Sequence, residues 1–118
     1  MPYISSSHYL RMKKKYREEV ARHLAECARR QEVITYGELA DRFGGIARAW
    51  GDALGGIAIR CHEKGWPLLP VVVVNKKTRM PSVAAVLYKD LGLQSESDIR
   101  AEQAKCFAKD WTSTSLLS

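Results

Sequence analysis

The stretch Val33-Ile-Thr-Tyr-Gly-Glu-Leu-Ala-Asp-Arg-Phe43 carries the clearest local structural signal in this chain. Thr35 and Glu38 have the spacing of a capping box, in which each side chain accepts a hydrogen bond from the backbone N–H of the other residue. Leu39 and Phe43 lie four residues apart and therefore share one helical face. Gly44-Gly45 follows, and glycine commonly ends a helix because it adopts left-handed backbone angles freely. The stretch predicts a short helix that opens at Thr35 and ends at Gly44.

A second helical run is predicted over residues 46–62. Its apolar residues repeat at spacings of four, three and four: Trp50, Leu54, Ile57 and Cys61. Three glycines interrupt the run, at positions 51, 55 and 56, and each costs about 1 kcal/mol relative to alanine in a helix. Close approach of the backbone to another helix or to a ligand is the usual compensation. Gly65, Pro67 and Pro70 end this helix and frame a turn.

A strand and a basic turn come next. Val71-Val72-Val73-Val74 is short and β-branched, which predicts a buried strand. Asn75-Lys76-Lys77-Thr78 then predicts a polar turn with two adjacent cations. Residues 83–88 fit either a partner strand or a short helix, and the pattern does not separate these two. The fold expected is mostly α with a small β-hairpin or wing.

Helices are predicted on both sides of this core. Residues 1–7 indicate a flexible leader, and residues 8–30 an N-terminal helix with one apolar stripe. Residues 95–112 indicate a C-terminal helix that packs back through Ile99, Phe107 and Trp111. The order helix, turn, helix, strand and turn is typical of a winged helix-turn-helix, here expected as one domain over residues 1–118.

Composition narrows the class of protein. No apolar run approaches the roughly 20 residues that cross a bilayer, and no signal-like segment opens the chain, so a cytoplasmic location and no membrane contact are expected. The three cysteines, Cys27, Cys61 and Cys106, are too scattered for a disulfide framework or a zinc site. No carboxylate pair, metal-ligand cluster or phosphate-binding glycine loop is evident. We therefore expect no cofactor, no metal and no enzymatic activity.

The net charge of +6 is unevenly distributed. Residues 1–30 carry eight Lys or Arg against three acids, and residues 66–95 carry four against one. Basic patches favour polyanionic partners, although ordinary solvated lysines would give the same composition. The side chains expected to contact phosphate are Lys13, Lys14, Lys15, Lys76, Lys77 and Arg79.

Residues 32–82 resemble the C-terminal DNA-binding domain of the O6-alkylguanine-DNA alkyltransferases and alkyltransferase-like proteins. That family carries approximately V-x-Y-G-x-[VL]-A, then A-R-A-V-G-x-A-[LM], then N-P-x-P-[IL]-[LI]-x-P-C-H-R. This chain has Ile34-Thr35-Tyr36-Gly37-Glu38-Leu39-Ala40, then Ala47-Arg48-Ala49-Trp50-Gly51-Asp52-Ala53-Leu54, then Trp66-Pro67-Leu68-Leu69. The resemblance covers about half of the chain, with the motifs in the same order.

The resemblance implies roles for three residues. Tyr36 would help to rotate a nucleotide out of the duplex, and Arg48 would enter the base stack through the minor groove. Gly51 would let its helix lie close to the DNA backbone. Flipping a base costs a few kcal/mol, and a side chain that fills the gap offsets part of that cost. A surface salt bridge from Arg48 to Asp52 is the alternative role for that arginine.

The same alignment indicates that this chain lacks the family's catalytic residues. The P-C-H-R motif falls on residues 71–74, so the acceptor thiolate is replaced by Val72 and its activating histidine by Val73. Alkyl transfer needs an activated sulfur nucleophile, which valine does not supply. Cys61-His62 is no substitute, because adjacent helical residues project about 100° apart. Cys61 is expected to be a packed thiol.

Two functions remain open from the sequence. The first is non-catalytic binding of duplex DNA by a winged-helix domain of alkyltransferase-like type. The alternative is a protein-interaction module, such as an immunity protein, an antitoxin or a phage-encoded inhibitor of a bacterial defence system. Its candidate anchors are Trp50, Trp66 and Trp111, although burial in the core is the commoner role of tryptophan.

Overall fold

The computed structural model describes residues 10–11, 13–45, 50–81, 88, 91–114 and 116. In chain order the elements are α2 (Glu18–Arg29), β1 (Ile34–Thr35), α3 (Tyr36–Phe43), α4 (Gly51–Glu63), η2 (Leu69–Val72), β2 (Val73–Val74), α6 (Glu96–Ala108) and η3 (Trp111–Ser113), where η denotes a 3-10 helix. The domain is mostly α, as predicted, with a radius of gyration of 13.0 Å. Among the described residues, every helix is too short or too polar to cross a bilayer.

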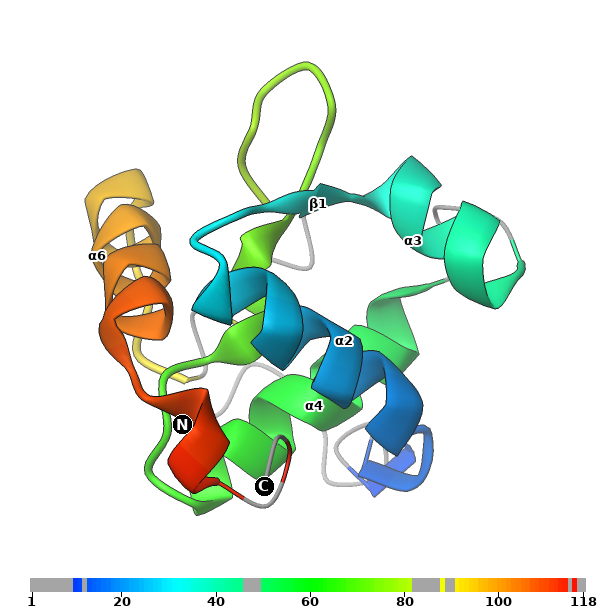
Figure 1. Cartoon of the computed structure of the whole chain (residues 1–118), viewed down its shortest axis with the longest axis horizontal. Helices are drawn as coiled ribbons and strands as arrows, with labels where there is room; N and C mark the ends of the chain where they lie inside the picture. The colour runs from blue at the N-terminus through cyan, green and yellow to red at the C-terminus, as the bar shows by residue number, and fades with distance from the viewer. Residues whose placement is uncertain are drawn as a thin grey trace.

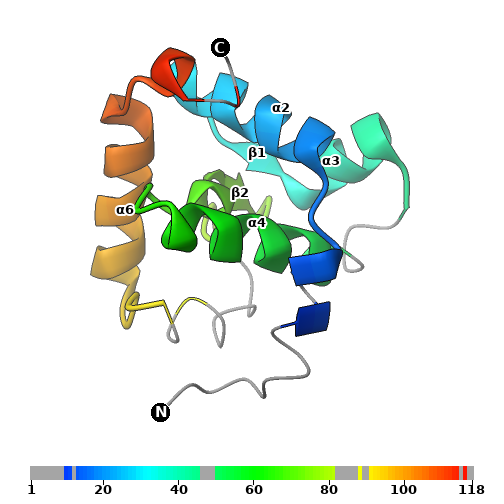
Figure 2. The same cartoon turned by 90° about the horizontal axis from the view of Figure 1, so that it is seen from below.

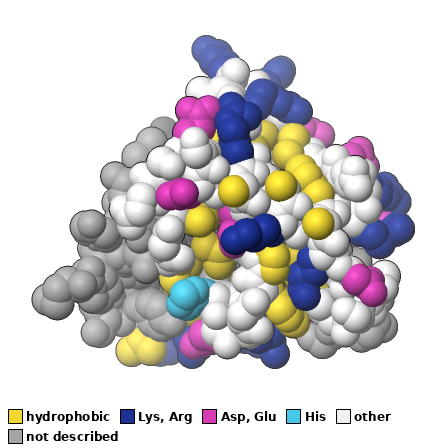
Figure 3. Space-filling view, turned by 90° about the vertical axis from the view of Figure 1, so that its left-hand side faces the viewer, with side chains coloured by type: hydrophobic (Ala, Val, Ile, Leu, Met, Phe, Trp, Pro, Cys, Tyr) yellow, Lys and Arg dark blue, Asp and Glu magenta, His cyan; other side chains and the backbone are white. Residues whose placement is uncertain are grey.

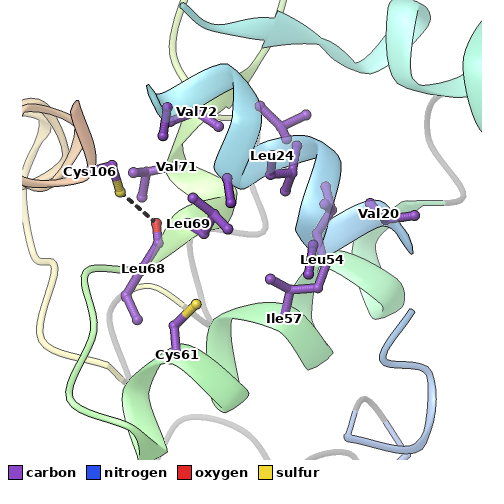
Figure 4. Close-up of a cluster of buried hydrophobic side chains, with 14 of the residues drawn as sticks. Val20, Leu24, Leu54, Ile57, Cys61, Leu68, Leu69, Val71, Val72 and Cys106 are labelled. Atoms are coloured by element: carbon purple, nitrogen blue, oxygen red, sulfur yellow. Dashed lines mark hydrogen bonds between the residues drawn. The ribbon is translucent and has the colours of Figure 1, made fainter. Parts of the chain in front are cut away.

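The centre of the fold is the buried segment over residues 68–74, which contains η2 and β2. It packs against α2, α4 and α6, with α6 along one side of the molecule (Figure 1 and Figure 2). Figure 4 shows Leu69, Val71 and Val72 facing the apolar side chains of α2 and α4. Residues 71–74 are all fully buried, so the four valines form the middle of the core.

The predicted strand over residues 71–74 is only half correct. Val73 and Val74 form β2, whereas Val71 and Val72 belong to the 3-10 turn η2. Pro70 lies at the start of that turn, where its fixed φ and missing N–H suit a helical first turn better than a strand ladder. The four valines alone do not reveal this effect, because a β-branched run is compatible with either structure.

The observed sheet is parallel and not the expected hairpin. Ile34 pairs with Val73, and Thr35 pairs with Val74. Residues 83–88, expected as either a partner strand or a short helix, lie outside the described residues except for Tyr88, which is helical.

The predicted starts of α3 and α6 are confirmed, and both have a capping box. The hydroxyl of Thr35 accepts from the N–H of Glu38 at 3.1 Å, and the carboxylate of Glu38 accepts from the N–H of Thr35 at 3.2 Å. Ser95 and Asp98 form the same arrangement at the start of α6. Helix α3 ends at Gly44, which has a φ of +93°. Helix α6 ends at Ala108, short of the predicted residue 112, and the chain then turns into η3.

Two further helix ends have the Schellman pattern. At the end of α4, Trp66 N donates to Cys61 O at 2.9 Å and Gly65, with a φ of +73°, donates to His62 O at 3.1 Å. At the end of α2, Glu32 N donates to Cys27 O at 2.9 Å, and Gln31 occupies the left-handed position with a φ of +59°. Gly65 ends α4 as predicted, whereas Gln31 occupies a conformation that glycine would adopt more easily.

The N-terminal helix is not continuous over residues 8–30. Leu10, Arg11, Lys13 and Lys14 are helical, but the long helix α2 begins only at Glu18, after an extended Arg17. Glu18 and Glu19 occupy the first turn of α2, where negative charge is favoured by the helix dipole. The Tyr16 ring lies under the Arg60 guanidinium of α4, 4.2 Å from the ring centroid. This contact and the acidic first turn favour a break before α2. The predicted leader, residues 1–7, lies outside the described residues.

Helix α6 supplies the hydrogen bonds that residues 68–72 cannot make in a sheet. The Glu102 carboxylate accepts from Leu68 N at 2.7 Å, and the Gln103 amide donates to Val71 O at 2.8 Å. Cys106 Sγ donates to Leu68 O at 3.7 Å. These three contacts anchor the buried segment to α6.

We expect Glu102→Ala to lower the free energy of unfolding by about 1–3 kcal/mol, because the buried Leu68 N–H loses its acceptor. Glu102→Gln should cost less, since the amide oxygen can still accept that bond. Glu96→Ala is the control: Glu96 forms an exposed pair with Arg100, and such pairs contribute about 0.5 kcal/mol or less. Urea denaturation measures all three variants, and equal losses for Glu102→Ala and Glu96→Ala would contradict the anchoring role.

Candidate nucleic-acid interface

Residues 75–80 form a closed turn that projects from the body of the domain (Figure 1). We call this segment the basic turn. Asn75 N donates to Met80 O, and Arg79 N donates to Asn75 O, both at 2.8 Å. Inside the loop, the side-chain oxygen of Asn75 accepts from Lys77 N at 2.9 Å. This hydrogen bonding holds the turn in one shape, with its cations pointing into solvent.

Arg79 occupies an unusual position in the basic turn. Its φ of +58° lies in the left-handed region, where a residue with a Cβ is strained by about 1–2 kcal/mol. Glycine or asparagine is the ordinary choice at such a position. Arginine at this position therefore costs the turn some stability that glycine would not cost, as glutamine does at Gln31.

The parallel strand pair places the basic turn beside the start of α3. Thr35, the N-cap of α3, pairs with Val74, and Val74 leads directly into Asn75. A groove of about 410 Å³ lies between these two segments. Its lining residues are Thr35, Tyr36, Gly37, Asn75, Lys76 and Lys77. Two predicted phosphate contacts, Lys76 and Lys77, therefore share a groove with Tyr36.

The cations of the basic turn have no acidic partners in the described part of the chain. No carboxylate described in the structure lies within 4 Å of Lys76, Lys77 or Arg79, and all three side chains are exposed. Figure 3 shows Lys and Arg side chains gathered at the apex of the molecule, where Figure 1 places the turn. The apex thus carries three cations that form no ion pair with a described carboxylate.

The N-terminal cations are different, because most of them are paired. Lys13 contacts Glu63 at 2.8 Å, and Arg17 contacts Glu19 at 2.7 Å. Within α2, three arginines pair with neighbouring glutamates: Arg22 with Glu18, and Arg29 and Arg30 with Glu26. Much of the positive charge of residues 1–30 is neutralised in this way.

The structure separates the two basic regions. The basic turn is at the top of Figure 1, whereas the segment before α2 lies at the lower right. Lys13, Lys14 and Lys15 therefore do not join Lys76 and Lys77 in one patch.

Two other predicted site residues belong to the region around the start of α4. Arg48 lies outside the described residues. Gly51 is the first residue of α4, and a Cβ built there would meet nothing within 4 Å. The described residues around this position therefore leave room for a larger side chain.

Residues 71–74, on which the resemblance places the alkyl-acceptor motif, are core valines. Cys61 is 1% exposed, and burial raises its pKa to about 11. His62 beside it is exposed, so the two side chains point apart as predicted. Burial also raises the pKa of Cys106. Both thiols are protonated packing groups.

Sequence reasoning missed one thiol–imidazole contact. Cys27 Sγ lies 3.8 Å from His23 Nε2, one helical turn earlier in α2. The i, i+4 spacing was the available signal. Burial raises the pKa of Cys27 and lowers the pKa of His23, so both groups are held neutral. A thiolate–imidazolium pair, which a nucleophile would need, is disfavoured here.

The three tryptophans divide into two kinds. Trp50 and Trp111 are 4% and 1% exposed and belong to the core. Trp66 is partly exposed and packs against the edge of this core. Of the three candidate anchors for a protein partner, Trp66 alone reaches the surface.

Comparisons with known proteins add no relative. No protein-family model matches the chain, and no curated protein or solved structure matches it either. In the described part of the chain, no three His, Cys, Asp or Glu side chains are grouped to hold a metal ion. Any functional assignment therefore depends on the surface geometry.

We expect the native thiols to resist alkylation at pH 8. With a pKa of about 11, Cys61 is ionised to only ~0.1% at that pH, and burial blocks access to both Cys61 and Cys106. Iodoacetamide labelling followed by mass spectrometry should give slow modification of the half-buried Cys27 alone. All three cysteines should react in denaturant, and rapid native labelling of Cys61 would contradict the assigned packing role.

Proposed function

We propose that this protein binds duplex DNA without catalysis, through the basic turn and the adjoining start of α3. The observation that carries this proposal is the groove lined by Tyr36, Lys76 and Lys77, beside cations that form no ion pair with the described carboxylates. A DNA-binding surface needs positive side chains that are free to replace the counterions of phosphate. In the described chain the basic turn meets that requirement better than the paired N-terminal cations.

The shape of this region also suits a phosphate backbone. Lys76, Lys77 and Arg79 project from a turn that is internally hydrogen-bonded, so little of its backbone would have to be ordered on binding. Because Thr35 and Glu38 cap the start of α3, the positive charge offered to phosphate comes from the side chains of the basic turn. Phosphate contacts of this kind position a protein on DNA and carry no sequence information themselves.

The order of elements supports a winged-helix type of reader. Helix α3, helix α4 and the basic turn follow one another as the resemblance to the alkyltransferase-like domain implies. In this proposal Tyr36 contacts the DNA backbone from the groove, and Arg48, near the start of α4, enters the minor groove. Fully buried valines at the aligned reactive positions support a role limited to binding.

Replacing Arg79 tests its contribution to DNA binding separately from its effect on stability. Arg79→Gly should leave stability unchanged or raise it by up to about 1 kcal/mol, because glycine tolerates the positive φ. The same change should weaken DNA binding and reduce the slope of log K against log salt by about 1. Thermal melts and gel-shift titrations at several salt concentrations measure the two effects.

Gln31→Gly is the matched control, because Gln31 is the other non-glycine residue described with a positive φ. It should change stability in the same direction and leave the DNA affinity unchanged. Equal affinity for the Arg79→Gly and Gln31→Gly variants would rule out a contact from Arg79.

A pair of double variants tests where DNA binds. Lys76→Gln/Lys77→Gln should reduce the salt slope by about 1.8, since each phosphate contact contributes about 0.9. Lys14→Gln/Lys15→Gln removes the same charge from the N-terminal region and should leave the slope nearly unchanged. Fluorescence anisotropy with a labelled duplex gives both slopes. This proposal is wrong if the wild type has no affinity for duplex DNA at low salt. If a stoichiometric protein partner is also recovered from the native host, the protein-interaction module becomes the supported function.

A further inference from the structure

Trp66 presents a partly exposed indole at the end of the molecule opposite the basic turn. It follows the C-terminal end of α4 and lies beside η3, both at the bottom of Figure 1. The Schellman hydrogen bond from Trp66 N to Cys61 O fixes its backbone. Its ring meets the edge of Trp111, with centroids 5.9 Å apart and an interplanar angle of 85°. Trp111 is itself held by a 2.7 Å bond from Nε1 to Cys106 O.

Two lysines flank this ring. The Lys64 ammonium lies 5.4 Å from the Trp66 centroid, and the Lys109 ammonium lies 5.9 Å from it. Lys109 is also 5.5 Å from the Trp111 centroid. No described carboxylate lies within 4 Å of either ammonium. The neighbouring Asp110 accepts hydrogen bonds from the N–H and hydroxyl of Thr112.

We propose that Trp66, Lys64 and Lys109 form a binding surface for single-stranded nucleic acid. A rigid, partly exposed aromatic ring stacks with any base, and flanking ammonium groups contact the phosphates on either side. The cation–π contacts hold the two lysines near the ring, and neither forms a salt bridge with a described carboxylate. This surface is separate from the basic turn, so it does not depend on duplex binding there.

A protein partner fits this surface less well. Protein hot spots centre on an aromatic anchor within a well-packed apolar surround. Here the ring is bordered by ammonium groups, and Leu10 is the one large hydrophobic side chain strongly exposed among the described residues. Charge and stacking therefore favour a polyanion with flat bases over an apolar protein surface.

Tryptophan fluorescence provides a direct test. Trp50 and Trp111 are buried, so quenching by a short oligothymidylate at low salt should report on Trp66. Trp66→Ala should weaken binding about tenfold or more. Lys64→Gln/Lys109→Gln should reduce the salt dependence of oligothymidylate binding. This variant keeps the packing of the Trp66 ring, so it tests the surface even if Trp66→Ala misfolds. Circular dichroism checks the fold of each variant.

The matched control is Lys76→Gln/Lys77→Gln, which should weaken duplex binding and leave oligothymidylate binding unchanged. The proposal is overturned if oligothymidylate causes no quenching, or if the Lys64→Gln/Lys109→Gln variant binds as the wild type does. Equal quenching by polyglutamate would also overturn it, since that result would indicate an acidic protein segment as the ligand. A failure of duplex binding alone would not contradict the proposal of a single-strand-binding surface at Trp66.

Discussion

The fold depends on satisfying the backbone hydrogen bonds of residues 68–74, which run through the middle of the core. A buried N–H or C=O without a partner costs free energy comparable to a lost hydrogen bond. The two-residue strand pair serves only the end of this segment. Side chains of α6 bond three further backbone groups, through Glu102, Gln103 and Cys106, and 3-10 hydrogen bonds within the segment satisfy others. Helix α6 therefore does more than cover the valines. Its side chains also supply hydrogen bonds to a buried segment that is not enclosed in a complete sheet.

This constraint also determines where the candidate site lies. Because residues 73–74 pair in parallel with residues 34–35, the segments that follow the two strands begin at the same edge of the sheet. One continues into α3, and the other continues into the basic turn. The groove containing Tyr36, Lys76 and Lys77 is a direct consequence of that parallel pairing. An antiparallel pairing of the same strands would have directed the turn away from α3.

Local geometry explains why one basic region is compensated and the other is not. A helix brings residues three and four apart together, so α2 pairs its arginines with glutamates of its own surface. A six-residue turn has no such neighbours, and Lys76, Lys77 and Arg79 remain solvated. The total charge is therefore a poor guide to the binding surface. Both proposed binding surfaces use cations that no described carboxylate approaches within 4 Å, at the apex and around Trp66.

The sequence by itself determined the features that depend on neighbours along the chain. The capping box of Thr35, the helix start at Ser95 and the glycine stops at Gly44 and Gly65 were predicted correctly, because each involves residues within one helical turn. Tertiary structure decided what depends on contacts between distant residues. It divided residues 71–74 between a 3-10 turn and a parallel strand, broke the N-terminal helix at Tyr16 and buried two of three tryptophans. It also brought Tyr36 beside Lys76 while leaving Lys13, Lys14 and Lys15 elsewhere, because long-range packing, rather than local propensity, determines which surfaces meet.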